Sequence, residues 1–225
     1  MSTRPSIRAK QISAQSCQLY LITPPNMGQG GPSSFVEPFK TALGEGEVAC
    51  VQLRLKEASD DTIRKACDTL LPIARDHDVS FILNDRADLA VELGCDGVHL
   101  GQEDLPYKEA RALVGINSII GVTCKSSRDL AFEAGEAGAD YVAFGAFFKS
   151  RTKLGTNPAD VSLLSWWQEM MTVPCVAIGG ITVQNCRTVI DAGADFIAVS
   201  GGVWEHPIGP GAAVKAFHRM CSFND

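Results

Sequence analysis

The segment GADYVAFG, residues 138 to 145, returns in related form as GCDGVHL at 94 to 100 and as GADFIAVSGG at 193 to 202. In each copy a glycine follows a helix-like run, a small residue and Asp come next, and a short apolar run begins. A glycine just past the end of a helix commonly adopts the left-handed conformation that caps it. The repeat therefore predicts a unit made of helix, glycine cap, Asp turn and buried strand.

The rest of the chain continues this alternation. We predict strands at 18–23, 48–56, 80–84, 97–100, 118–123, 141–144, 175–178 and 196–200. Helices are predicted at 34–43, 59–76, 86–93, 106–114, 126–137, 160–171, 182–192 and 210–218. This pattern of strands, each followed by a helix, predicts an α/β fold, a single-domain TIM (β/α)8 barrel. The alternative, an open doubly wound sheet, would place GxGxxG after the first strand, and residues 28–31 do not supply that spacing.

Composition narrows the class of ligand. The 225 residues are 45% hydrophobic, which is enough for a sizeable core, and they carry a net charge of -6. An acidic balance gives no support for a nucleic-acid partner. No apolar run is long enough to span a membrane. We therefore expect small-molecule substrates, and the sequence leaves homo-oligomer formation open.

Cysteine usage and the first residues bear on the compartment. The eight cysteines show no CxxC or other metal-ligand spacing, which predicts reduced thiols in a cytoplasmic protein and not a disulfide framework. Residues 1–16 contain cations and no acids. We interpret them as a flexible extension of a barrel domain at 17–225. An organelle transit peptide is the alternative, because such peptides share this composition.

The stretch VQLRLK, residues 51 to 56, alternates apolar and polar side chains with the period of a strand. In a barrel one face of each strand packs on helices and the other lines the interior, and active sites lie at the carboxyl ends of the strands. We therefore expect Gln52, Arg54 and Lys56 to line the interior and to approach this mouth. Because a buried cation without a partner is costly, the pattern predicts an anionic ligand.

Other polar side chains follow the predicted strands and should reach the same mouth. Asp85 and Asp104 follow neighbouring strands, and Mg²⁺ is often held by one or two carboxylates together with substrate phosphate. The turns 179–181 and 200–202 are rich in glycine and follow the last two strands, where phosphate sites are common in this fold. The other candidates at strand ends are Asn84, His99, Gln102, Thr123, Ser150, Thr152 and Lys153.

Each of these residues also has a structural interpretation. Asp85 and Asp104 both precede predicted helices and would suit helix N-termini. The glycines could instead be plain turn glycines, although we favour the phosphate site. Residues 24–33 form either an idle surface loop or a lid, of which we favour the loop. His99 is expected to be an interior histidine with satisfied hydrogen bonds. The functional interpretation rests on the convergence of several strands on one mouth.

The motifs QLRLK, NDR, DGVHLGQED, GADYVAFGAFF with a following TK, and AIGGI resemble those of the thiamine phosphate synthase family over residues 19–217. The resemblance implies a Mg²⁺-dependent transferase that joins hydroxymethylpyrimidine diphosphate to thiazole phosphate and releases diphosphate. Electrostatic stabilisation of the leaving group and positioning of the thiazole would supply the rate, without an enzyme nucleophile.

The resemblance also implies roles for single residues. Arg54 and Lys153 would be the catalytic cations, and Asp85 and Asp104 would be the metal ligands. The residues expected on the pyrimidine diphosphate are Gln52, Arg54, Lys56, Asn84, Thr123 and Lys153. Those expected on the thiazole phosphate are Ser150, Thr152, Gly180, Ser200 and Gly201.

Some positions depart from the family pattern and keep two alternatives open. Thr123 replaces a usual serine, Ser150 replaces a threonine, and Gly201 stands where serine is frequent. A thiazole tautomerase-like barrel would bind thiazole phosphate without needing the acids and cations of a diphosphate site. A non-catalytic barrel would bind thiamine phosphate tightly and show no turnover.

Overall fold

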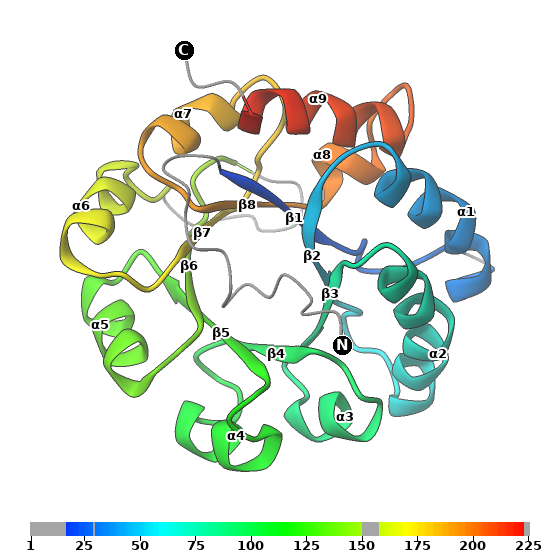
Figure 1. Ribbon diagram of the computed structural model, residues 1–225, viewed down its shortest axis with the longest axis horizontal. Helices are drawn as coiled ribbons and strands as arrows, with labels where there is room; N and C mark the ends of the chain where they lie inside the picture. Colours follow the sequence, from blue (N-terminus) through cyan, green and yellow to red (C-terminus); the bar gives the residue numbers. More distant parts are fainter. Residues whose placement is uncertain (1–16, 29, 150–157, 223–225) are drawn as a thin grey trace.

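The computed structural model describes residues 17–28, 30–149 and 158–222, which form a closed barrel of parallel strands in the order β1-β2-β3-β4-β5-β6-β7-β8. Figure 1 looks along the barrel and shows the helices as an outer ring. The predicted single-domain TIM barrel is confirmed. The predicted extension at 1–16 lies outside the described residues, as do Ser150, Thr152 and Lys153.

The strands lie close to their predicted positions. Their bounds are β1 Gln18–Ile22, β2 Val48–Leu53, β3 Ser80–Asn84, β4 Gly97–Leu100, β5 Ile119–Lys125, β6 Tyr141–Gly145, β7 Cys175–Ile178 and β8 Phe196–Val199. The helices are α1 Gly31–Gly44, α2 Asp60–Asp76, α3 Ala87–Glu92, α4 Tyr107–Val114, α5 Arg128–Ala137, α6 Ser162–Met170, α7 Cys186–Asp191, α8 Gly201–Trp204 and α9 Pro210–Ser222. The short helix α8 was not predicted, because a single turn carries no periodic signal.

The three sequence repeats build the amino ends of alternate strands. Their glycines have φ of +69° at Gly94, +96° at Gly138 and +100° at Gly193, so the predicted left-handed caps are confirmed. The Asp that follows each glycine uses its Oδ2 to accept a backbone N–H of the preceding strand in the barrel. These bonds run from Phe81 to Asp96, from Ile120 to Asp140 and from Cys175 to Asp195, each at 2.8 Å. The shared spacing within the repeat therefore links neighbouring strands together.

Two apolar cores lie on opposite faces of the strands. The larger one packs the outer face of the barrel against the helices and includes Val51, Leu53 and Trp167. The smaller one fills the barrel interior with side chains such as Tyr20, Ile82 and Val176. All eight cysteines are free thiols, and Cys95 alone among them is not fully buried. Within the described part of the chain, no helix is long and apolar enough to cross a membrane.

The VQLRLK segment follows the prediction only in part. Val51 and Leu53 lie in the outer core, and Gln52 is 3% exposed on the inner face. The strand ends at Leu53, however, because the Arg54 N–H donates to Thr23 Oγ1 (2.9 Å) and not to a neighbouring strand. Arg54 is half-buried and Lys56 is exposed. The expectation that Lys56 lines the barrel interior is therefore wrong.

Candidate active site

The mouth begins with two amides on adjacent strands. Gln52 Nε2 donates to Asn84 Oδ1 across β2 and β3 at 2.6 Å. This bond uses one donor of Gln52 and the acceptor of Asn84. It leaves the Gln52 carbonyl oxygen as an acceptor and the Asn84 amide as a donor. The pair can therefore hydrogen-bond to a ring that carries both a donor and an acceptor.

The two predicted metal ligands lie close to each other at the ends of β3 and β4. Asp85 is exposed at the mouth, yet partial desolvation of its carboxyl there, followed by the hydrogen bond and the charge of Asp104, raises its pKa to about 6, and the Arg54 cation opposes this shift. Asp104 Oδ2 accepts the Gly101 N–H at 2.6 Å, which holds that carboxylate in place. Two carboxylates and a cation therefore converge on one point of the mouth.

The backbone at Asp85 is unusual. Its φ is +66°, a conformation that costs non-glycine residues energy and is concentrated at functional sites. Its N–H donates to the His99 carbonyl of β4 (2.8 Å), which ties the turn to the neighbouring strand. The cap residues of α3 and α4 are Arg86 and Pro106, so the alternative that these two aspartates cap the helices is wrong.

The turn after β7 approaches the chain that follows β6. Gly180 has φ of +65°, and a Cβ at this position would lie 2.6 Å from the Lys149 carbonyl oxygen. Only glycine is compatible with both the conformation and this close approach. Asn185 Nδ2 donates to the Gly180 carbonyl (3.0 Å) and braces the turn from the side of α7.

The turn after β8 leads directly into α8. The Ser200 carbonyl accepts the N–H groups of Val203 (2.9 Å) and Trp204 (3.0 Å), and Gly201 opens the helix. Trp204 Nε1 donates to the Ile22 carbonyl at 2.7 Å, which anchors α8 beside β1. Loops after the last two strands, together with a short extra helix, form the usual phosphate site of this fold. Gly180, Ser200 and Gly201 occupy these positions.

His99 lies in the barrel interior, below the mouth, and is 7% exposed. Its Nδ1 bonds the Tyr141 hydroxyl at 2.9 Å and its Nε2 bonds Thr123 Oγ1 at 2.7 Å, so the prediction of a satisfied interior histidine is confirmed. Burial lowers the pKa of His99 to about 4. Gln102 Nε2 donates to the Thr123 carbonyl (2.6 Å) and links the ends of β4 and β5.

Three residues of this region were missed at the sequence level. Thr23, 1% exposed, carries the hydroxyl that accepts the Arg54 N–H. Tyr20 and Tyr141 have hydroxyl groups that bond each other at 2.9 Å. Their short apolar strands gave only a core signal, because strand patterning does not show which buried hydroxyls will meet.

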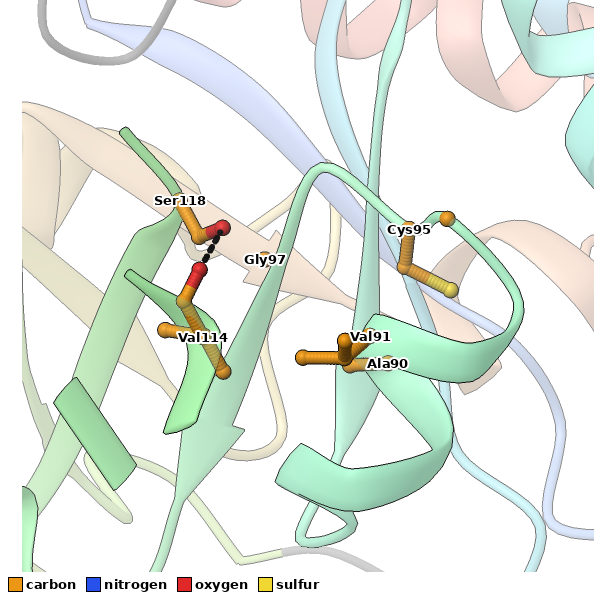
Figure 2. A pocket seen from close by; sticks show the side chains of 7 residues that line it. Ala90, Val91, Cys95, Gly97, Val114 and Ser118 are labelled. Carbon is orange, nitrogen blue, oxygen red and sulfur yellow. Dashed lines mark hydrogen bonds between the residues drawn. The ribbon is translucent and has the colours of Figure 1, made fainter. Parts of the chain in front are cut away.

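A separate pocket of about 210 Å³ lies at the other end of the barrel. Figure 2 shows it between α3 and α4, with Val91, Cys95 and Val114 around it and the Ser118 hydroxyl donating to the Val114 carbonyl. Gly97, which also lines it, is the first residue of β4. The pocket therefore opens at the amino ends of the strands, away from the predicted site residues that the structure describes.

The family model and the curated relatives indicate one family. A family model described as thiamine monophosphate synthase matches residues 19–203. A thiamine-phosphate synthase of Rhodospirillum centenum is 60% identical over 91% of this chain and 97% of its own length. One from Hyphomonas neptunium is 50% identical over 90% of this chain and 93% of its own. The solved thiamine phosphate pyrophosphorylase of Pyrococcus furiosus superposes with a TM-score of 0.78 at 32% identity, covering 91% of this chain and 95% of that one.

Proposed function

The chain belongs to the thiamine monophosphate synthase family, and we propose that its mouth joins hydroxymethylpyrimidine diphosphate to thiazole phosphate with Mg²⁺ bound at Asp85 and Asp104. The activity itself follows from the synthase relatives. The observation that carries the site assignment is the convergence of Asp85, Asp104 and Arg54 at the ends of neighbouring strands. Carboxylates forced together beside a cation are typical of a site completed by a cation and an anionic ligand.

The donor set fits Mg²⁺. Among the described residues there is no group of three or more His, Cys, Asp or Glu that could hold a metal. Mg²⁺ does not need one, because it commonly binds one or two carboxylates and completes its shell with substrate phosphate and water. Asp85 and Asp104 would hold the ion, which would neutralise charge on the diphosphate. Its positive charge would also favour the ionised form of Asp85, whose pKa is raised by desolvation and by Asp104.

The diphosphate half of the site needs a cation for the diphosphate and polar groups that hydrogen-bond to the pyrimidine ring. Arg54 is half-buried, its N–H is held by Thr23, and it lies close enough to Asp85 to lower the pKa of that carboxyl. We assign its guanidinium to the departing diphosphate, where two parallel hydrogen bonds to phosphate oxygens suit its geometry. The Gln52–Asn84 pair and Thr123 would position the aminopyrimidine.

The thiazole phosphate would lie at the turns after β7 and β8. Gly180 lets the backbone approach closely, and the Ser200–Gly201 turn leads into α8, whose first backbone N–H groups would bind phosphate oxygens. The proposed contacts of Ser150, Thr152 and Lys153 fall outside the described residues. Lys56 is exposed beyond the end of β2, so its proposed contact would need the ligand to extend past the strand.

The reaction then requires positioning and charge, and no protein nucleophile. The bond from the pyrimidine methylene carbon to the diphosphate oxygen breaks, and its electron pair leaves with the diphosphate. The aminopyrimidine donates electron density to the carbon, and the lone pair of the thiazole nitrogen forms the new C–N bond. Arg54 stabilises the charge that develops on the leaving group, and stabilisation of this kind commonly contributes more to enzymatic rates than any other effect. Two ligands held over the same mouth react as if in one molecule.

The direct test is to mix the purified protein with both substrates and Mg²⁺ and to detect thiamine phosphate by its conversion to a fluorescent oxidised form. A parallel reaction with EDTA in place of Mg²⁺ tests the metal. We expect metal-dependent product. Aromatisation of the thiazole precursor without coupling would support the tautomerase-like alternative, and tight thiamine phosphate binding without turnover would support the non-catalytic one.

A further inference from the structure

A chain of hydrogen bonds crosses the barrel interior from β1 to β5. The Tyr20 hydroxyl of β1 bonds the Tyr141 hydroxyl of β6 at 2.9 Å, and the latter bonds His99 Nδ1 of β4 at 2.9 Å. His99 Nε2 then bonds Thr123 Oγ1 of β5 at 2.7 Å. The rings also pack on one another, with centroids 5.9 Å apart for the two tyrosines and 5.6 Å for His99 and Tyr141.

The barrel makes room for this chain at Gly121. A Cβ at this position would lie 1.9 Å from Cζ of Tyr141, so only glycine lets the phenol lie across β5. Gly121 and Thr123 are two residues apart on one strand and therefore face the same side. Tyr20 and Tyr141 are 1% and 0% exposed. Purely apolar side chains would fill this space without the cost of burying polar groups, so core packing alone does not account for the chain.

The groups at the two ends of this chain of hydrogen bonds determine which residue donates in each bond. The neutral imidazole of His99 has one donor and one acceptor, so all bonds in the chain must point the same way. At the first end of this chain of hydrogen bonds, Tyr20 lies beside the Cys50 thiol, and sulfur is a weak acceptor. If each group donated in the direction from Thr123 to Tyr20, the Tyr20 O–H would donate to that sulfur. If each group donates in the direction from Tyr20 to Thr123, the donors of Tyr20, Tyr141 and His99 all meet oxygen or nitrogen.

We propose that Tyr20, Tyr141 and His99 are positioning residues that hold His99 as its Nε2–H tautomer and thereby orient the Thr123 hydroxyl toward the ligand. Thr123 Oγ1 then accepts from His99, and its own proton is available to an acceptor on the ligand, such as a ring nitrogen of the aminopyrimidine. The proposal rests on the proposed function, in which Thr123 contacts the pyrimidine. It extends the substrate site across the barrel interior to β1.

The tautomer can be measured without any substrate. In ¹⁵N-histidine-labelled protein at neutral pH, nitrogen chemical shifts distinguish the two tautomers, and the His99→Gln variant identifies the His99 signals. We expect Nε2–H for His99 in the wild-type protein and a loss of that preference in Tyr141→Phe. Tyr107→Phe is the matched control, because it removes a phenol hydroxyl that donates to the Gly138 carbonyl outside the barrel. An Nδ1–H tautomer, or an unchanged His99 in Tyr141→Phe, overturns the proposal.

The kinetic consequence is specific to one substrate. Tyr141→Phe should lower kcat/KM for the pyrimidine diphosphate about fivefold to tenfold, as expected for one misplaced hydrogen bond, and leave KM for the thiazole phosphate unchanged. Thr123→Val should cause a similar loss, Thr123→Ser should restore activity, and the Tyr141→Phe/Thr123→Val double variant should be no worse than Thr123→Val alone. Losses that multiply in the double variant overturn the coupling. If wild-type protein makes no thiamine phosphate, the proposed function fails, and the tautomer measurement still decides the orientation of the chain.

Discussion

The two ends of the barrel use the same residue type in opposite ways. At the amino ends of the strands, the aspartates of the sequence repeats each accept a backbone N–H of the neighbouring strand: Asp96, Asp140 and Asp195. At the carboxyl ends, Asp85 and Asp104 lie against each other, and the pKa of Asp85 is raised. At the first end the carboxylates accept hydrogen bonds from the backbone. At the second end they lie where a metal ion or a ligand could bind them.

The difference shows that the carboxylates at the amino ends stabilise the fold, whereas Asp85 at the carboxyl ends lowers stability and serves binding. Asp140 also pairs with Arg111 at 2.6 Å, and both side chains are mostly buried, at 9% and 15% exposed. A buried carboxylate with such partners contributes to folding, because removing one partner leaves the other without compensation. Asp85 instead raises the free energy of the ligand-free protein. The two ends should therefore respond in opposite ways to the same Asp→Asn substitution.

The largest expected effect is at Asp104. Asp104→Asn removes one of the two proposed metal carboxylates and should lower turnover by about a thousandfold, since stabilisation by the metal of the charge that develops on the departing diphosphate is worth several kcal/mol. The concentration of Mg²⁺ needed for half-maximal rate should rise, and unfolding in urea should be little changed. Glu103→Gln, at the exposed neighbouring residue, is the control. An unaltered rate and metal response in Asp104→Asn would remove this residue from the metal site.

At the opposite end, Asp140→Asn should act on stability. We expect a loss of about 3 kcal/mol in the free energy of unfolding, because Arg111 remains buried without its charge partner. Urea denaturation measures this, and the folded fraction should keep its kcat. The control is Asp191→Asn, which breaks an exposed pair with Arg187 and should cost less than about 1 kcal/mol. Equal losses in the two variants would contradict the role given to the buried pair.

Arg54 provides the matching test for cations at the mouth. Arg54→Ala should lower kcat/KM for the pyrimidine diphosphate by about thirtyfold, which is about 2 kcal/mol and typical of a hydrogen bond to a charged group. Stability should change little, because the side chain is half-exposed. Steady-state kinetics with each substrate varied in turn would show whether the loss is confined to the diphosphate. Kinetics identical to those of wild type would place Arg54 outside the site.

The smallest effect is a gain in stability at Asp85. Between pH about 3.8 and about 6 the folded protein binds more protons at this carboxyl than the unfolded chain does, so its contribution lowers stability as the pH rises. Asp85→Asn should therefore stabilise the metal-free protein at pH 7 by about 1 kcal/mol, a value reduced by solvent screening of the exposed carboxylate. The gain should vanish near pH 4, where wild-type Asp85 is protonated. Melting curves at the two pH values test this, and a gain that is independent of pH would show that ionisation of Asp85 is not its cause.

Local signals predicted most of the fold. Glycine caps, Asp turns and short apolar runs depend on neighbouring residues, so the strand bounds of β3, β4 and β7 were predicted to the residue. Predictions failed where a distant group competes for the backbone. The strand predicted at 48–56 ends at Leu53 because Thr23 takes the Arg54 N–H, and Lys56 is consequently exposed.

The sequence by itself determined the barrel and the set of polar residues at strand ends, because both follow from periodicity and from the rule that parallel strands end on one side. Only the tertiary structure decided which of those residues meet. The Gln52–Asn84 and Tyr20–Tyr141 bonds join different strands, the Asp85–Asp104 contact joins the loops that follow β3 and β4, and the two tyrosines are separated by 121 positions. Closure and register of the barrel set these distances, and no local pattern records them.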